Sequence, residues 1–362
     1  MRAPANLKTL TALRFFAALW VVLYDYWPNL GLASPTVVAK GYLGVEVFFT
    51  LSGFILCHVY LEQVETKAFR YGAFLWARLA RIYPMHLASI ALIGVMGAVA
   101  LASGRPVDPN SISLAALPAN LLLVNAWGLS PVSGWNHASW SISAEWFAYL
   151  TFPVFALAAL ALKARPRLAV ALAVGFVAGL YAVFYRLTGQ SLTHATIAWG
   201  ALRIVPCFAL GCAAYLVWRA SLVRSGAVAW AGAAISGALL ITFAQLGAPD
   251  AFIVAAGSGL IVSLAFAAKT WIDGPVLNKL VYLGEISYSI YMLFVPWQLL
   301  FVNVTSKLFH YDKAHMPVYL WLVFVVSLVP LAAAAYHFIE RPARDRMRAG
   351  FRRVGRLSVT VS

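Results

Sequence analysis

The apolar stretch LTALRFFAALWVVLYDYW, residues 10–27, decides the class of fold. It is close to the roughly 20 residues that an α-helix needs to cross a bilayer. Only Arg14 and Asp25 interrupt it with ionisable side chains. Arg2 and Lys8 precede it as in a signal peptide, but its length and the lack of a clear cleavage site favour a retained membrane helix.

The composition of the whole chain also indicates a membrane protein. Of the 362 residues, 62% are hydrophobic and 11% are charged, and the mean hydropathy is +0.81. In soluble domains about a quarter of the residues carry charge. We therefore expect an all-α, polytopic integral membrane protein with about ten membrane helices. The expected spans are 10–27, 43–61, 83–102, 141–162, 168–186, 197–217, 226–246, 251–270, 281–302 and 317–338.

Positive charge is unevenly distributed between these spans. Most of the 27 lysines and arginines lie before the first span, in alternate connections or after the last span, so the positive-inside rule places both termini in the cytosol. We expect residues 1–340 to form one transmembrane domain. Residues 341–362 are expected to form a basic cytosolic tail against anionic membrane lipid. The net charge of +15 then reflects membrane topology, and no nucleic-acid partner is expected.

Two ionisable residues share the first span. Arg14 and Asp25 are eleven residues apart. Eleven steps of about 100° bring both side chains to nearly the same face of a helix, about 16 Å apart along its axis. Ionisable side chains inside a membrane are costly and mark functional sites unless a neighbouring helix pairs with them. Both interpretations are open for Arg14.

Three acidic residues, Asp25, Glu46 and Glu145, are expected at a similar depth toward the outside. Close, buried carboxylates raise one another's pKa, so such a set supplies either a base and an acid or only a polar network. His137 precedes Glu145 by eight residues. It is the histidine best placed to reach this level, with a surface-loop role as its alternative.

On the cytosolic side, Arg78 and Arg81 are three residues apart in WARLARIYP. This spacing gives neighbouring positions on a helix. Paired arginines suit phosphate recognition because each guanidinium offers several donors. The pair is therefore either an ordinary inner anchor or, together with Arg14, a binding site for a polyanion.

Other signals in the chain are weaker. The histidines form no HExxH or similar metal motif, so no metal site is expected. The cysteines Cys57, Cys207 and Cys212 lack CxxC spacing and are interpreted as packing residues. The GxxxG motif at Gly175 and Gly179 favours a helix contact within the bundle.

Several segments, taken in order, resemble the motifs of the membrane acyltransferase-3 family. The resemblance covers nearly the whole chain, and the order of the motifs is more specific than any one of them. The segments are LTALRFFAALWVVLYDYW, GYLGVEVFFTLSGFIL, RLARIYP, ASWSISAEWFAY, GEISYSIYMLFVPW and FIERPAR.

The resemblance implies an O-acyltransferase of a bacterial cytoplasmic (inner) membrane. The reaction it implies transfers an acyl group, commonly acetyl, from cytosolic acyl-CoA to a hydroxyl of a carbohydrate, glycolipid or similar acceptor at the outer face. Acyl-CoA is then a co-substrate, and no bound cofactor is implied. Arg14, Arg78 and Arg81 fall on the family's functional arginines, and Glu145 falls on the acid of its motif.

Some members of the family are fused to an extracytoplasmic hydrolase-like domain. Here about 22 residues follow Glu340. We therefore expect the chain either to complete the transfer itself or to pass the acyl group to a separate extracytoplasmic partner.

Two positions depart from the family pattern. Members usually carry a histidine, taken as the general base, where this chain has Asp25, and often a second histidine where it has Phe294. A carboxylate is a weaker base than imidazole unless burial raises its pKa. Three interpretations stay open: Asp25 is the base, another base such as His137 replaces it, or the chain is catalytically disabled.

A disabled chain would bind acyl-CoA or a sugar-lipid without turnover. A transporter-like membrane binding protein is the rival class, because charges inside a membrane also mark transport pathways. The sequence shows no repeated halves and no matched pair of broken helices, which disfavours transport.

Overall fold

The structure, a computed structural model, describes residues 7–270 and 274–360, the stretch 351–360 by its backbone alone. Ten helices in these ranges are long and apolar enough to cross a membrane, and no strand forms within them. The prediction of an all-α, polytopic membrane protein is confirmed. The spanning helices are α1 (Lys8–Tyr26), α3 (Gly44–Glu65), α4 (Tyr71–Ala102), α6 (Ser139–Ala161), α7 (Pro166–Thr188), α8 (Gly200–Arg219), α9 (Gly226–Gln245), α10 (Asp250–Ala267), α12 (Ser287–Phe309) and α13 (Val318–Ala335).

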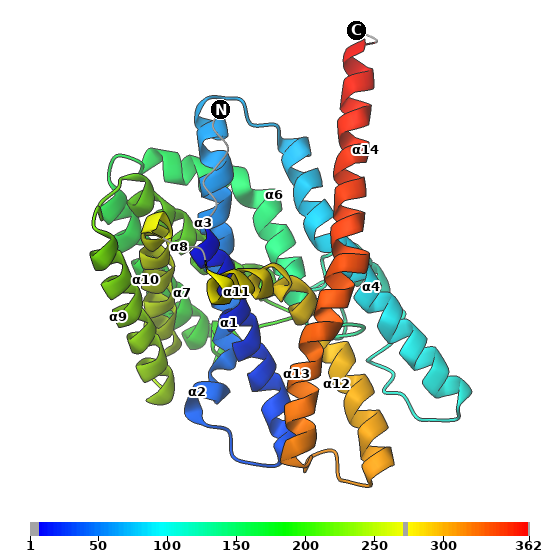
Figure 1. Cartoon of the computed structure of the whole chain (residues 1–362). Helices are drawn as coiled ribbons and strands as arrows, with labels where there is room; N and C mark the ends of the chain where they lie inside the picture. The colour runs from blue at the N-terminus through cyan, green and yellow to red at the C-terminus, as the bar shows by residue number, and fades with distance from the viewer. Residues whose placement is uncertain (1–6, 271–273, 361–362) are drawn as a thin grey trace.

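Shorter or peripheral helices complete the described chain. α2 (Thr36–Ala39) and α5 (Leu117–Leu121) are short, and α11 (Pro275–Glu285) packs against α1. α14 (Arg341–Thr360) continues α13 through one π-helical turn, Tyr336–Glu340. Figure 1 shows α14 projecting from the bundle on the same side as the connection between α3 and α4. We call this side the basic end and the other side the opposite end.

Two predicted spans begin at the wrong residue. The span predicted at 83–102 starts too late, because α4 begins at Tyr71. Arg78 and Arg81, predicted at neighbouring positions of a helix, lie within α4, and both line a cavity in the bundle interior. The span predicted at 281–302 starts too early, because α11 and α12 are separate helices that meet at Ile286.

The contact between α3 and α8 forms the centre of the bundle. These two helices are the most buried of the ten spans. They approach closely because Gly53 and Gly211 face each other's backbone. A Cβ at Gly53 would lie 2.1 Å from the carbonyl oxygen of Phe208, and one at Gly211 would lie 2.0 Å from that of Thr50. Small residues at such contacts let membrane helices gain van der Waals packing.

The GxxxG motif of α7 does not make such a contact. A Cβ at Gly175 or at Gly179 would meet no heavy atom of the described residues within 4 Å. The prediction that this motif packs within the bundle was wrong. Spacing alone does not show which face of a helix meets a neighbour, and these glycines lie on a face that its neighbours leave open.

The segment between α4 and α6 folds back into the bundle and fixes the start of α6. The Ser143 hydroxyl donates to the carbonyl of Leu123 (2.8 Å) and accepts from the backbone N–H of Ala126 (3.0 Å). The Trp127 indole donates to the Ser143 carbonyl (3.1 Å). These bonds hold the helix that carries Glu145.

We expect Gly211→Ala to destabilise the protein, because the added methyl group overpacks the close contact between α3 and α8. Overpacking costs about 1–3 kcal/mol or more where backbone is the neighbour. The midpoint of thermal unfolding in detergent should fall for this variant and stay near that of wild type for Gly175→Ala. Equal midpoints for the two variants would contradict the close α3–α8 contact.

Candidate active site

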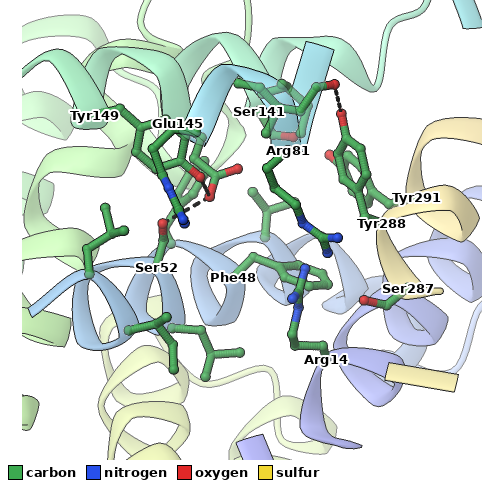
Figure 2. Close-up of a pocket in the computed structure, with 18 of the residues that line it drawn as sticks. Arg14, Phe48, Ser52, Arg81, Ser141, Glu145, Tyr149, Ser287, Tyr288 and Tyr291 are labelled. Atoms are coloured by element: carbon green, nitrogen blue, oxygen red, sulfur yellow. Dashed lines mark hydrogen bonds between the residues drawn. The ribbon is translucent and has the colours of Figure 1, made fainter. Parts of the chain in front are cut away.

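A cavity of about 240 Å³ lies between α1, α3, α4, α6 and α12. Its lining is mainly apolar and aromatic, with a few polar side chains that point inward (Figure 2). This composition is typical of small-molecule sites. The ionisable residues in the lining, apart from its tyrosines, are Arg14, Arg78, Arg81 and Glu145.

Glu145 is oriented by two hydroxyl groups. The Ser52 hydroxyl donates to its Oε1 at 2.9 Å, and the Tyr149 hydroxyl donates to the same atom at 2.5 Å. Oε2 has no hydrogen-bond partner among the described residues. The carboxylate is thus held in place through one oxygen while the other remains available to a ligand in the cavity (Figure 2).

Arg14 reaches the cavity from α1. Its guanidinium forms no hydrogen bond or ion pair with any residue that the structure describes. It points toward the guanidinium of Arg81 (Figure 2), which repels it, whereas Glu145 lies close enough to attract it. A partly buried guanidinium without a direct partner fits an anion-binding site.

Arg81 is paired with an acid from the end of α13. Its Nη1 lies 2.6 Å from Oε1 of Glu340, which is fully buried. The Ser289 hydroxyl donates to the second carboxylate oxygen of Glu340 (2.7 Å), and the Arg81 guanidinium lies 5.6 Å from the ring of Tyr288. Arg81 is therefore fixed at the cavity wall with much of its charge balanced.

Arg78 has weaker partners. It donates to the Tyr60 hydroxyl at 3.4 Å and lies over that ring at 5.6 Å. Its Nε is buried without a hydrogen-bond partner among the described residues. The cavity thus brings together the three arginines interpreted as a polyanion site. Arg14 and Arg78 have no carboxylate partner among the described residues.

Asp25 does not line this cavity. It is partly buried near the far end of α1, where its backbone carbonyl accepts from Gln298 at 3.2 Å. Gln298 follows the cavity residue Tyr291 by seven positions, about 10 Å along α12. The Asp25 carboxylate has no hydrogen bond or ion pair with the described residues. It is therefore an unpaired ionisable group in the half of the bundle nearer the opposite end.

Glu46 is also outside the cavity, in a buried ion pair with Arg203. The pair is bidentate, with Nε–Oε1 and Nη2–Oε2 distances of 2.6 and 3.0 Å, and both side chains are at most 2% exposed. Arg203 also donates to the carbonyl of Ala195 and stacks on Trp140. The structure therefore does not gather Asp25, Glu46 and Glu145 into one site, because α8 supplies Glu46 with its own partner.

His137 lies in the loop before α6, exposed and outside the cavity lining, where its Nδ1 contacts the Ser133 hydroxyl. Despite this exposure, nearby protein desolvates the charged ring and lowers the pKa of His137. The ring is thus neutral at pH 7, as a base requires. No group of three His, Cys, Asp or Glu side chains that could hold a metal ion occurs within the part of the chain that the structure describes.

The sequence alone assigns no role to Glu340, which pairs with Arg81 at the cavity, or to Arg203, which pairs with Glu46 outside it. Glu340 was visible as an acid at the end of an apolar run, a signal that marks intramembrane function. Arg203 lies inside the span predicted at 197–217, but its partner Glu46 is 157 positions away in sequence. Spacing does not predict such a pairing.

A bundle of ten membrane helices around an internal cavity lined by three arginines and one carboxylate defines the class, a polytopic membrane protein with a mainly cationic internal cavity. Comparison with known proteins identifies it further. The chain belongs to the acyltransferase-3 family, whose model, described as an acyltransferase domain, matches residues 7–337. It is a membrane O-acyltransferase by family, and the acyl group it moves is not aminoacyl.

Relatives agree with this assignment. The acyltransferase MdmB of Streptomyces mycarofaciens is 30% identical, over 80% of this chain and 78% of its own length. The O-acetyltransferase OatA of Staphylococcus aureus is 24% identical, over 96% of this chain but 58% of its own length. Protein 2 in the picA locus of Rhizobium radiobacter is 30% identical over 40% of this chain. No solved structure matches the chain significantly.

We expect Glu46→Gln to destabilise the protein by roughly 3–5 kcal/mol, because it leaves Arg203 as an uncompensated buried charge. The double variant Glu46→Gln with Arg203→Gln should recover much of the loss in thermal unfolding midpoint and should retain activity. If the double variant is stable but inactive, Glu46 takes part in catalysis and its ion pair is not purely structural.

Proposed function

We propose that the chain transfers an acyl group, most simply acetyl, from cytosolic acyl-CoA to a hydroxyl of a carbohydrate or glycolipid at the outer face of a bacterial cytoplasmic membrane. The basic end of the bundle then faces the cytosol. The observation that carries the proposal is one cavity lining that holds both Arg14 and Arg78, which have no carboxylate partner in the described part of the chain, and Glu145, whose Oε1 alone is hydrogen-bonded there.

The choice of acyl-CoA as the donor follows from the positive charge of the cavity lining. Acyl-CoA is a thioester that carries several phosphate groups, and arginine binds phosphate through parallel N–H donors. Arg14, Arg78 and Arg81 lie on the wall nearer the basic end, from which a cytosolic donor would enter. The acetyl group is favoured by the name of OatA, an O-acetyltransferase.

The acyl-transfer step needs a base that takes the proton of the acceptor hydroxyl. The acceptor oxygen attacks the thioester carbonyl, its proton passes to a base, the C–O bond forms, and the C–S bond breaks. The CoA thiolate leaves and takes up a proton. Glu145 is our first candidate for the base, because its Oε2 is unpartnered in the cavity while Ser52 and Tyr149 hold its Oε1. General bases of this kind contribute about 10²–10⁴-fold to rate.

Asp25 is a second candidate, supported by a different observation. Its carboxylate is unpaired among the described residues and lies toward the opposite end, where an acceptor from outside would arrive. In this version Asp25 removes the proton and Glu145 binds and orients the acceptor. His137 is the third candidate, and its exposed position favours contact with an acceptor or with a separate extracytoplasmic partner.

The proposal is tested with purified protein in nanodiscs, labelled acetyl-CoA and a panel of sugar acceptors. We expect release of CoA that depends on the acceptor, together with an acetylated product. Glu145→Gln should lower kcat by about 10²-fold or more without loss of CoA binding. Ser52→Ala, which removes one of the two bonds to Oε1, serves as the matched control and should have the smaller effect.

Tight CoA binding by wild type without release in the presence of any acceptor would instead support a binding protein. Equal kcat for wild type and Glu145→Gln would remove Glu145 from the proton transfer.

A pair of substitutions at position 25 tests the second candidate. If Asp25 is the base, Asp25→Asn should abolish transfer, whereas Asp25→His should keep or raise it, because imidazole is the stronger base at neutral pH. Product formation is measured for both variants at saturating acetyl-CoA. Full activity in Asp25→Asn would exclude this role, and activity gained only in Asp25→His would show that the natural chain is disabled at this position.

A further inference from the structure

The last helix, α14, packs along α4 and brings more arginines to the basic end. The Trp76 indole of α4 donates to the backbone carbonyl of Met347 at 2.9 Å, which fixes the two helices side by side. Arg344 and Arg348 are four residues apart and therefore share one face of α14. This face meets α4, because Arg344 lies 3.6 Å from Glu340, the partner of Arg81, and the Nε of Arg348 is buried.

The positive charges in this region outnumber the negative ones. Glu340 lies 2.6 Å from Arg81 and 3.6 Å from Arg344, and the exposed Asp345 lies 3.7 Å from Arg344. Arg348 has no carboxylate partner among the residues described, and its Nε is buried and unpaired, as is the Nε of Arg78. Clustered like charges are unfavourable until an anion joins them.

The size of the cavity indicates where such an anion would sit. At about 240 Å³, the cavity is smaller than the roughly 300–1,000 Å³ that encloses a drug-sized ligand. The thioester arm of a nucleotide-linked acyl donor would occupy much of it, and the cavity could hold only part of the phosphate groups beside its own arginines, leaving the rest at its mouth. Arg78 lines the cavity. Arg348 does not line it but lies close to Arg78.

We propose that Arg348 of α14, together with Arg78, binds phosphate groups of the acyl donor outside the cavity, so that the basic tail is part of the donor site. This inference rests on the proposed function for the identity of the donor. A lipid headgroup is the competing source of phosphate. Arg346, on the exposed face of the same helix, is better placed for lipid, whereas Arg348 is partly buried beside α4.

Arg348→Gln is the variant that tests the proposal, and Arg346→Gln is its matched control on the same helix. CoA and inorganic pyrophosphate are titrated calorimetrically into protein in nanodiscs of neutral lipid. We expect Arg348→Gln to weaken CoA binding roughly 10-fold to 100-fold, as loss of a hydrogen bond to a charged group does. Arg346→Gln should bind as wild type does.

The thermal midpoint separates a binding role from a structural one. Without ligand, Arg348→Gln should unfold at or above the wild-type temperature, because the substitution removes a repelled charge. A lowered midpoint with unchanged CoA affinity would overturn the proposal, and so would equal losses of affinity in both variants, which indicate nonspecific attraction to the helix.

Failure of the proposed function gives a different result. If wild type binds pyrophosphate in an Arg348-dependent manner but binds CoA no more tightly, the phosphate site stands and acyl-CoA is not its ligand. If wild type binds neither probe, both proposals fall.

Discussion

The ion pair between Arg81 and Glu340 is the interaction on which the arrangement at the basic end depends. It joins α4 to the π-helical turn after α13, at a distance of 2.6 Å and with Glu340 fully buried. A π-helical turn changes the direction in which successive side chains point, and such turns are frequent at functional sites. Here it points Glu340 into the bundle, and α14 continues from it along α4. Removal of either partner would leave a buried charge uncompensated, which is strongly unfavourable.

Inside the low dielectric of the bundle, the presence or absence of an ion-pair partner distinguishes structural charged residues from functional ones. Glu46 and Arg203 satisfy each other through two hydrogen bonds, and neither is accessible to a ligand. Arg14 and Asp25 have no such partner among the described residues, although charge inside a membrane is costly. An unpaired charge that a membrane protein retains needs a binding partner that arrives later or a role in chemistry. Pairing is therefore a better guide to function in this bundle than the depth of a residue in its span.

The sequence was sufficient for the number of spans, because apolar length determines it, though not for where two of them begin. It also singled out Arg14, Arg78, Arg81 and Glu145, which share one cavity lining. It was not sufficient for contacts between helices. The carboxylate of Glu46 has the depth expected of a catalytic acid, yet Arg203, remote in sequence, occupies it. Arg348 looked like one of many tail arginines, and only the packing of α14 on α4 distinguishes it from Arg346. Helix periodicity gives the face of a residue but not the neighbour that the face meets.

The two departures from the family pattern lie in one place. The hydroxyl of Tyr26, next to Asp25, donates to the carbonyl of Phe294 at 2.7 Å, and Gln298, one turn after Phe294, donates to the carbonyl of Asp25. The ring of Phe294 packs against Tyr26 and Tyr291, so an apolar side chain fills the position of the second histidine. Two imidazoles there would supply a proton acceptor and a second titrating group. Here the Asp25 carboxylate supplies one titrating group, and the phenyl ring of Phe294 supplies none. Positions 25 and 294 are therefore linked by hydrogen bonds between α1 and α12, and a test of proton transfer at Asp25 has to take both positions into account.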